Sequence, residues 1–454
     1  MQNSRAADVV EFRRRLSSDP DDRVTWHNLA AAEGDVGHAA EAEDAARRAL
    51  ALGIAAPETR LVLARALLAQ RRLDEAERVF EEALALRPAY VDAHRDLAQL
   101  RWMRTGQTEP ALRRLESEIK RTPREPGLHW VKSLVLEFSG DPSAALAAAE
   151  TGLNEAADPI PLLRQAAHLC TDFGDPARAL AFARRAASLA PAGSGAEIIV
   201  CEALLACGRL NEAGEIAASL FARHPFNQYV VATQAIVWRL LGDPRYAMLY
   251  DYDSLVDVQQ LELPSGWSSL DEFLAELAAD LEALHGFHTH PLQQSVRGGS
   301  QLPLYAPELA RRPIGALFRG IEAAVARYLT NVGPGGDPVR SRNVGRFAIS
   351  TAWSIRLVSG GHHVDHVHPN GWLSSACYVA LPRAIGKGGT HPGREGWLRF
   401  GRPCFRTDPR LTADHFVKPE AGSLVLFPAY MWHGVEPFES EEPRLAVAFD
   451  VVPG

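Results

Sequence analysis

The sequence predicts a multidomain protein that is α-helical first and then mainly β: an α-solenoid followed by a jelly-roll barrel with flanking helices. Alanine recurs every 33 to 35 residues through the first half, and this register stops after about residue 250. From about residue 345 the chain turns to short apolar segments separated by Gly, Pro and charged turns. We therefore expect a solenoid over residues 1–250, a helical connector over 251–284 and the barrel domain over 285–454.

The composition is that of a soluble globular protein with two or three domains. The chain has 454 residues, of which 46% are hydrophobic and 23% charged. A net charge of -8 argues against a general nucleic-acid or membrane-surface binder, because a polyanion is repelled on average. We find neither a signal-peptide pattern nor an apolar stretch of the roughly 20 residues that a membrane span needs.

The cysteines indicate neither a disulfide framework nor a thiolate zinc site. Their number is odd, they are scattered, and no pair has the CxxC spacing. The five are Cys170, Cys201, Cys207, Cys377 and Cys404. We therefore expect a cytoplasmic protein.

The alanine register predicts six to seven stacked helix–turn–helix units. Its positions are Ala42, Ala76, Ala111, Ala144, Ala179, Ala213 and Ala247. Small residues let two helices approach closely, and a proline such as Pro88, which closes LDEAERVFEEALALRP, stops the second helix. Because one unit cannot bury its own apolar face, the units must stack.

The A-x3-F-x2-A-x4-P pattern resembles the tetratricopeptide repeat family over roughly residues 8–250. This resemblance implies a concave groove that holds a protein or peptide partner.

The second half begins with a helix and continues with strands. Apolar residues recur at helical spacing in 268–287, and 288–301 is predicted to be a loop that leads into the barrel domain. The predicted strands are FAISTAWSIRLVS, WLSSACYVALP, GWLRFG, GSLVLFP and RLAVAFDVV. Short strands at this spacing are typical of a sandwich or a jelly-roll barrel.

A histidine cluster lies between the first two of these strands. His362, His363, Asp365, His366 and His368 fall within seven residues. Alone in a turn, His362 is expected to be a solvated surface residue. A non-heme Fe(II) site needs two imidazoles and usually a carboxylate, with positions left open. Two ligands one residue apart can both point inward from a strand end, because side chains alternate along a strand.

Two further residues complete the candidate site. His433 lies about 65 residues beyond the cluster, just past a strand, and Arg444 opens the final strand eleven residues later. A barrel can bring His433 alongside the cluster. Arg444 on a neighbouring strand can then pair bidentately with one end of a dicarboxylate.

The segments HVHPNGWLSSACYVALP, GSLVLFPAYMWHGVEPF and PRLAVAFDV resemble the 2-oxoglutarate/Fe(II)-dependent oxygenases over roughly residues 285–454. They are most similar to a bacterial and phage subgroup, and more broadly to the aspartyl/asparaginyl β-hydroxylases, some of which carry helical repeats. The resemblance implies a cupin-like double-stranded β-helix, the jelly-roll form of this family. It also implies Fe(II), 2-oxoglutarate and O2 as cofactors, with ascorbate as a supporting reductant.

Carried over residue by residue, His366 matches the first metal ligand and His433 the distal ligand, while Arg444 matches the residue that binds the 2-oxoglutarate C5 carboxylate. The third ligand stays open. The subgroup pattern gives His368 beside His366, the general HxD pattern gives His363 and Asp365, and a two-histidine site completed by water is the third alternative.

Tyr378 and Arg356 are further candidates for cofactor binding. For Tyr378 the alternative is a place in the core or the pocket wall. For Arg356 the alternatives are a salt bridge, plain packing or a contact with substrate.

The sequence therefore predicts a dioxygenase that hydroxylates a side chain of a protein or peptide recruited by the repeats, with neither nucleic acid nor membrane as a partner. One rival is a cupin-like zinc or manganese hydrolase or isomerase. The other is a non-catalytic repeat scaffold with a degenerate barrel.

Overall fold

The computed structural model describes residues 2–155, 160–191, 195–385 and 393–454. The chain forms two compact units, Met1–Ala157 and Asp158–Gly454. This division falls within the repeats, so the boundaries expected at residues 250 and 284 stay a prediction. Among the described residues, no helix combines the length and the apolar character that crossing a membrane requires.

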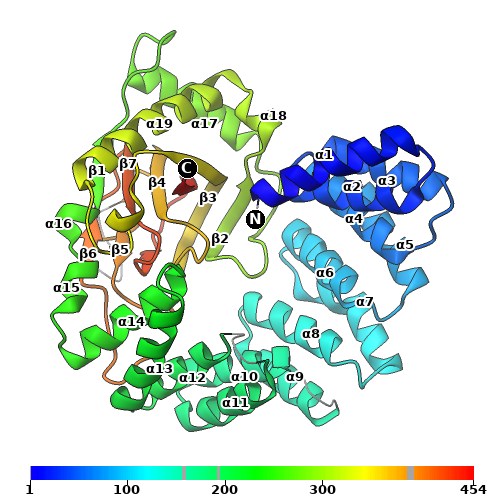
Figure 1. Ribbon diagram of the computed structural model, residues 1–454, viewed down its shortest axis with the longest axis horizontal. Coiled ribbons are helices and arrows are strands. Elements are labelled where there is room, and N and C mark those ends of the chain that lie inside the picture. Colours follow the sequence, from blue (N-terminus) through cyan, green and yellow to red (C-terminus); the bar gives the residue numbers. More distant parts are fainter. Residues whose placement is uncertain (1, 156–159, 192–194, 386–392) are drawn as a thin grey trace. The chain divides into compact units, whose positions relative to one another are not determined.

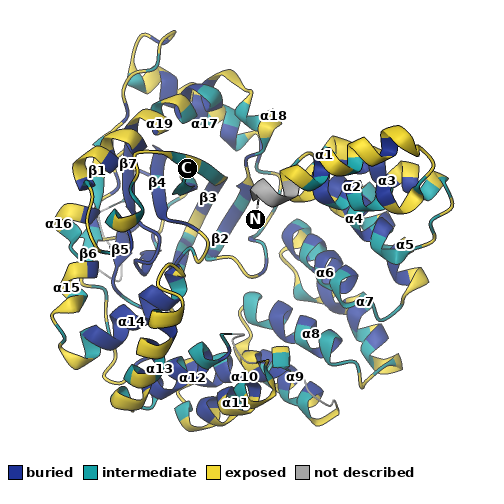
Figure 2. Cartoon of the chain, in the orientation of Figure 1, coloured by how far each residue is buried: buried dark blue, intermediate teal, exposed yellow. Residues whose placement is uncertain are grey.

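The first unit consists of helices that pack in consecutive pairs, α2 with α3, α4 with α5, α6 with α7 and α8 with α9. In Figure 2 their facing surfaces are buried and their outer surfaces exposed. The bounds are α1 Gln2–Ser18, α2 Arg23–Asp35, α3 Ala39–Ala51, α4 Pro57–Ala69, α5 Leu73–Leu86, α6 Val91–Thr105, α7 Thr108–Arg121, α8 Pro126–Phe138 and α9 Pro142–Glu155. Small residues at the helix contacts make this close pairing possible.

The alanine register lies on the second helix of each pair. Ala42, Ala76 and Ala111 are buried in α3, α5 and α7. In α9 Ala145 is fully buried, and Ala144 beside it is only half-buried. One residue turns a helix by about 100°, so in α9 Ala145 takes the buried place that the register assigned to Ala144.

Further repeat helices open the second unit. They are α10 Ile160–Asp172, α11 Pro176–Leu189, α12 Glu197–Ala206, α13 Leu210–Arg223 and α14 Gln228–Leu241, followed by the short helices α15 Arg245–Leu249 and α16 Tyr252–Leu255. Ala179 and Ala213 are buried in α11 and α13. Ala247 is exposed in the five-residue α15, so the buried alanine register ends at Ala213.

The rest of the second unit is a curled antiparallel sheet covered by helices. The strands are β1 Asp257–Gln260, β2 Val296–Pro303, β3 Phe347–His366, β4 Leu373–Ala380, β5 Leu398–Phe400, β6 His415–Val417, β7 Ser423–Pro428, β8 His433–Val435 and β9 Arg444–Pro453. Their order is β1-β7-β4-β9-β3-β8-β5-β6, with β2 paired to β3.

Helices cover this sheet on the side of its β1, β7 and β4 strands (Figure 1). They are α17 Leu270–Glu282, α18 Ala306–Leu309 and α19 Arg312–Val332, with the 3-10 turn η1 Arg340–Arg342 after them. Both α19 and β4 contact α17. The predicted fold class, a helical repeat array followed by a curled jelly-roll sheet, is confirmed.

The segment expected to be a loop before the barrel is in part a strand, so that prediction was wrong. Its second half forms β2, whose Gly299 lies opposite Leu357 of β3. A Cβ on Gly299 would lie 2.1 Å from the carbonyl oxygen of Arg356. Only glycine permits this close approach, and a residue without a side chain hides the alternation that marks a strand.

Helices of the second unit are hydrogen-bonded to the turns and loops that connect the strands of the sheet. The Trp432 amide donates to the Tyr250 hydroxyl at 3.0 Å, and the Tyr430 hydroxyl donates to the Leu249 carbonyl at 2.9 Å. The Asp408 amide donates to the Leu205 carbonyl of α12 at 3.0 Å. The first two contacts fix the turn between β7 and β8, which leads directly into His433.

Candidate metal centre

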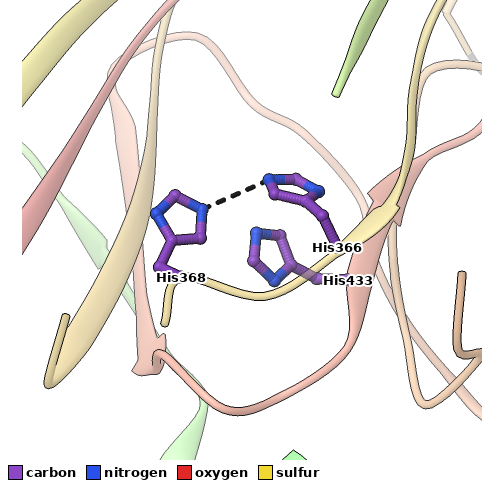
Figure 3. Close-up of side chains that lie close together, drawn as sticks. All are labelled: His366, His368 and His433. Carbon is purple, nitrogen blue, oxygen red and sulfur yellow. Dashed lines mark hydrogen bonds between the residues drawn. The ribbon is translucent and has the colours of Figure 1, made fainter. Parts of the chain in front are cut away.

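Three histidines meet where β3 and β8 pair. His366 ends β3 and lies directly opposite His433, the first residue of β8. His368 follows two residues later, and its Nε2 lies 3.2 Å from Nε2 of His366. One ring nitrogen of each histidine lies within 4.8 Å of the others, a spacing that a metal ion can bridge (Figure 3). Among the described residues, this is the one cluster of three or more such donors.

Backbone carbonyls orient two of these imidazoles. Nδ1 of His366 lies 3.0 Å from the Val364 carbonyl, and Nδ1 of His433 lies 2.8 Å from the Met431 carbonyl. Because a carbonyl oxygen can only accept, each Nδ1 carries the proton and donates it. Each Nε2 therefore keeps its lone pair for a metal.

The third imidazole is oriented by a carboxylate. Nδ1 of His368 lies 2.6 Å from Oδ1 of Asp450 on β9. A carboxylate behind a histidine fixes the ring and makes it a stronger donor toward a metal. Nε2 of His366 and Nε2 of His368 form a hydrogen-bonding pair at 3.2 Å (Figure 3), and a cation at this place would accept the lone pairs of both nitrogens instead. The three residues therefore fit a divalent metal.

Burial keeps the imidazoles of His366 and His433 neutral. Burial first, and the nearby His368 second, lower the pKa of His366 to about 3. The pKa of His433 is lowered well below its usual value for the same first reason, with His366 and His368 adding to it. A neutral imidazole is the form that binds Zn, Cu, Fe or Ni, so no proton has to leave these two rings at neutral pH.

Arg444 is a buried cation without a carboxylate partner among the described residues. It is 2% exposed, its Nε has no hydrogen-bond partner, and burial lowers its pKa. The Tyr378 hydroxyl is also buried without a partner, and its ring centroid lies 5.0 Å from Cζ of Arg444. Two unsatisfied buried donors side by side are costly to the protein alone, and an anion bound between them offsets that cost.

His363 interacts with both the histidine cluster and Arg444. Its ring centroid is 5.9 Å from that of His366, and Arg444 is one of the charges that, after burial and His366, lower its pKa. Its Nδ1 lies 3.0 Å from Oγ of Ser295. The structure does not bring His363 into the group of three.

Asp365 is held by arginines. Its Oδ1 lies 2.8 Å from Nε of Arg399, and its Oδ2 lies 2.6 Å from Nε of Arg402. The carboxylate is 5% exposed. Both of its oxygens are thus engaged in ion pairs, and the structure does not place the carboxylate of the HxD alternative in the histidine cluster.

Arg356 faces away from Arg444. In the antiparallel pair β3–β9, Leu357 lies opposite Arg444 and Arg356 lies opposite Leu445, so the two arginines are on different faces of the sheet. Nε of Arg356 lies 2.8 Å from Oε2 of Glu282 on α17. The structure thus gives Arg356 the salt bridge that was one of its alternatives.

His362 is half-buried, not the solvated surface residue expected, because β3 continues through the cluster to His366.

Sequence reasoning missed the residues that support the cluster, chiefly Asp450 and Arg399. Each was visible as a single charge in an apolar strand, RLAVAFDVV and GWLRFG respectively. A charge there must be paired once the strand is buried, and this is the signal that could have found both.

Comparisons with known proteins agree with this architecture. Residues 351–450 match the family described as "Putative 2OG-Fe(II) oxygenase", and residues 67–129 match the tetratricopeptide repeat family. The first match includes the three histidines and Arg444. No curated protein matches the chain significantly.

Solved structures with some similarity are repeat proteins. A thermophilic tetratricopeptide protein from Thermus thermophilus is 23% identical, with a TM-score of 0.32, over 40% of this chain and 99% of its own. A tetratricopeptide repeat protein from Parabacteroides merdae is 16% identical, with a TM-score of 0.34, over 44% and 77%. The pilF protein of Pseudomonas aeruginosa is 16% identical, with a TM-score of 0.34, over 45% and 92%.

The chain thus combines tetratricopeptide repeats with a segment that matches the 2OG-Fe(II) oxygenase family.

Proposed function

We propose that the protein is an Fe(II)- and 2-oxoglutarate-dependent dioxygenase whose metal is held by His366, His368 and His433. The observation that carries this proposal is the convergence of three imidazoles, with Nε2 of His366 and His368 only 3.2 Å apart. When bound, Fe(II) and 2-oxoglutarate supply oxidation of a substrate C–H bond by O2, with decarboxylation of 2-oxoglutarate to succinate.

In this proposal the second carboxylate of 2-oxoglutarate binds Arg444 and the Tyr378 hydroxyl. Both groups are buried and have unpartnered donors. A guanidinium binds a carboxylate with two parallel hydrogen bonds, and its burial makes the pairing strong and selective. Arg444 opens β9 next to β3, the strand that ends in His366, so one sheet carries both ends of the cosubstrate site.

The test is turnover of 2-oxoglutarate by the purified full chain. We expect Fe(II)-dependent formation of succinate that His433→Ala abolishes, because the distal ligand is lost. Tyr305→Phe is a matched control, since Tyr305 caps α18 outside the cluster and its backbone amide makes the capping contact with Glu308. Full succinate formation in the His433 variant would contradict the assignment of His433 as a metal ligand.

A zinc-dependent hydrolase is the second candidate, since three histidines without a carboxylate ligand are also a catalytic zinc set. Arg444 favours the oxygenase, because a hydrolase has no general need for a buried guanidinium without a partner. The intact histidine cluster likewise argues against a degenerate barrel that serves only as a scaffold.

For the substrate we propose a side chain of a protein or peptide that the repeats recruit. The support is the repeat array itself, since such arrays commonly hold extended partners. A peptide library incubated with the full chain, Fe(II) and 2-oxoglutarate should yield products heavier by one oxygen atom. If only free small molecules are oxidised, the repeats have another role.

A further inference from the structure

We propose that the protein has a second ligand site, a cavity on the opposite face of β5 from the histidine cluster that binds a phosphate-type dianion through arginines. The cavity measures about 380 Å³, within the range of small-ligand sites. Its walls come from β3, β5, the end of α10 and residues 402–411, all in the second compact unit.

The cavity is separate from the metal centre. None of the three clustered histidines lines it. Phe400 of β5 lies opposite His433 of β8, so these two side chains share one face, while Arg399 lies opposite Gly434 on the other. Arg399 lines the cavity, so the strand itself stands between the two sites.

The cavity wall has an excess of positive charge. It carries four arginines, Arg399, Arg402, Arg406 and Arg410, and two carboxylates, Asp172 and Asp365. Asp365 pairs with Arg399 and Arg402, and Arg399 also lies 3.4 Å from Glu436, which does not line the cavity. Asp172 lies 3.7 Å from His168. Four cations and two anions leave a net charge of +2 on the wall, in a chain whose total charge is -8.

Arg406 and Arg410 supply that excess, since neither forms an ion pair within the described part of the chain. Arg406 packs against the turn after α10, where a Cβ on Gly174 would lie 2.6 Å from its Nη1. The segment that carries both arginines is anchored, because the Asp408 amide donates to Leu205 and the Thr407 hydroxyl accepts from the Leu411 amide at 3.0 Å. A fixed backbone reduces the entropy that ligand binding must remove.

The number and origin of the arginines favour a phosphate group over a single carboxylate. A carboxylate is planar and accepts two guanidinium hydrogen bonds from one fork, whereas the tetrahedral oxygens of phosphate accept donors from several directions. Here the guanidiniums come from a strand and from three points along one loop. The phosphate can belong to a free small molecule or to a phosphorylated side chain, and the experiment separates these sources.

The test is calorimetric titration of the full chain with inorganic phosphate and with a phosphoserine peptide beside its unphosphorylated form. We expect one phosphate-type ligand to bind, more weakly as salt is raised. The double variant Arg406→Gln/Arg410→Gln should weaken binding at least tenfold, and Asp172→Asn should tighten it. Binding of phosphate itself indicates a free ligand, and binding of the phosphopeptide alone indicates a side chain.

Matched variants make the result specific. Arg14→Gln/Arg113→Gln removes the same charge from arginines whose side chains are 70% and 71% exposed on α1 and α7, and should bind like the wild type. Arg444→Met should also leave binding intact, because it lies at the metal centre. If the double variant unfolds, the single variant Arg410→Gln takes its place in the titration. The proposal is overturned if neither probe binds the wild type, if the arginine variants bind equally well, or if Arg444→Met abolishes binding.

Discussion

At the scale of single residues, the metal centre depends on groups that hold the imidazoles as much as on the imidazoles. Two carbonyls and the Asp450 carboxylate lie against the Nδ1 atoms, and one ring nitrogen of each histidine lies within 4.8 Å of the others. Sequence alone could indicate His366 and His433 by spacing. The sequence alone could not decide whether His368 or Asp365 is the third metal ligand. That depends on which side chain is already held in an ion pair, and in the structure Asp365 pairs with two arginines.

Substitution of Asp365 and His368 separates structural from metal-binding roles. We expect Asp365→Asn to lower the free energy of unfolding by about 1 to 3 kcal/mol, because the buried Arg399 loses its closer carboxylate and keeps only Glu436 at 3.4 Å. Fe(II) affinity of the folded variant should persist. His368→Ala should instead lose Fe(II) affinity in the folded variant, and it should also lower stability because the buried Asp450 loses the imidazole beside it. Isothermal titration with Fe(II) under anaerobic conditions, beside urea unfolding, measures both. The reverse pattern would make Asp365 the ligand.

Replacement of Arg444 tests the proposed carboxylate site. We expect Arg444→Met to raise the KM for 2-oxoglutarate roughly 30- to 1000-fold, since the loss of a buried charge-assisted pair costs about 2 to 4 kcal/mol. Fe(II) affinity should not change. Without cosubstrate, the variant should be as stable as the wild type or more so, because an uncompensated buried charge is gone. An unchanged KM would mean that Arg444 has another role.

At the scale of elements, β2 is the clearest case of a strand that sequence patterns could not reveal. Its central glycines lie against β3, and strand alternation cannot be read where side chains are missing. The short strands β1, β6 and β8 were also not predicted, since three or four residues carry too little pattern. The long β3, β4, β7 and β9 were visible because they alternate or are apolar throughout.

A methyl group at Gly299 should disrupt β2. We expect Gly299→Ala to destabilise the second unit by at least about 2 kcal/mol, because its Cβ would overlap the Arg356 carbonyl and the two strands would have to separate. Gly320→Ala in α19 is the matched control. Its Cβ would meet no atom within 4 Å, so stability should stay unchanged or rise by up to about 1 kcal/mol. Thermal unfolding of both variants is the measurement, and equal effects would contradict the close approach.

At the scale of the whole molecule, the order of helices and then strands could be predicted, because the alanine period stops after about residue 250 and apolar strands follow from about residue 345. The contacts between helices and sheet within the second unit could not. They depend on single hydrogen bonds, such as that from the Asp408 amide to Leu205, between residues about 200 positions apart. No local pattern encodes such a partner.

Metal removal should separate activity from folding. We expect a chelator to abolish succinate formation while helical circular dichroism stays unchanged, because the repeats bury their cores without the centre. Fe(II) should restore turnover, and Zn(II) should occupy the site without supporting turnover. Activity with Zn(II) alone would favour the hydrolase, and loss of helical signal would give the metal a structural role.

The hydrogen bonds of Tyr250 and Tyr430 have a practical consequence for dissecting the chain. A fragment that starts at residue 250 would lose Leu249 of α15, whose carbonyl accepts from the Tyr430 hydroxyl, and Tyr229 of α14, whose ring packs against that of Trp432 at 5.4 Å between centroids. Aromatic side chains now covered, among them Trp432, would then face water and promote aggregation. Anyone who wishes to isolate the sheet with its metal centre should therefore retain these helices, although a sequence-based boundary would place them with the repeats.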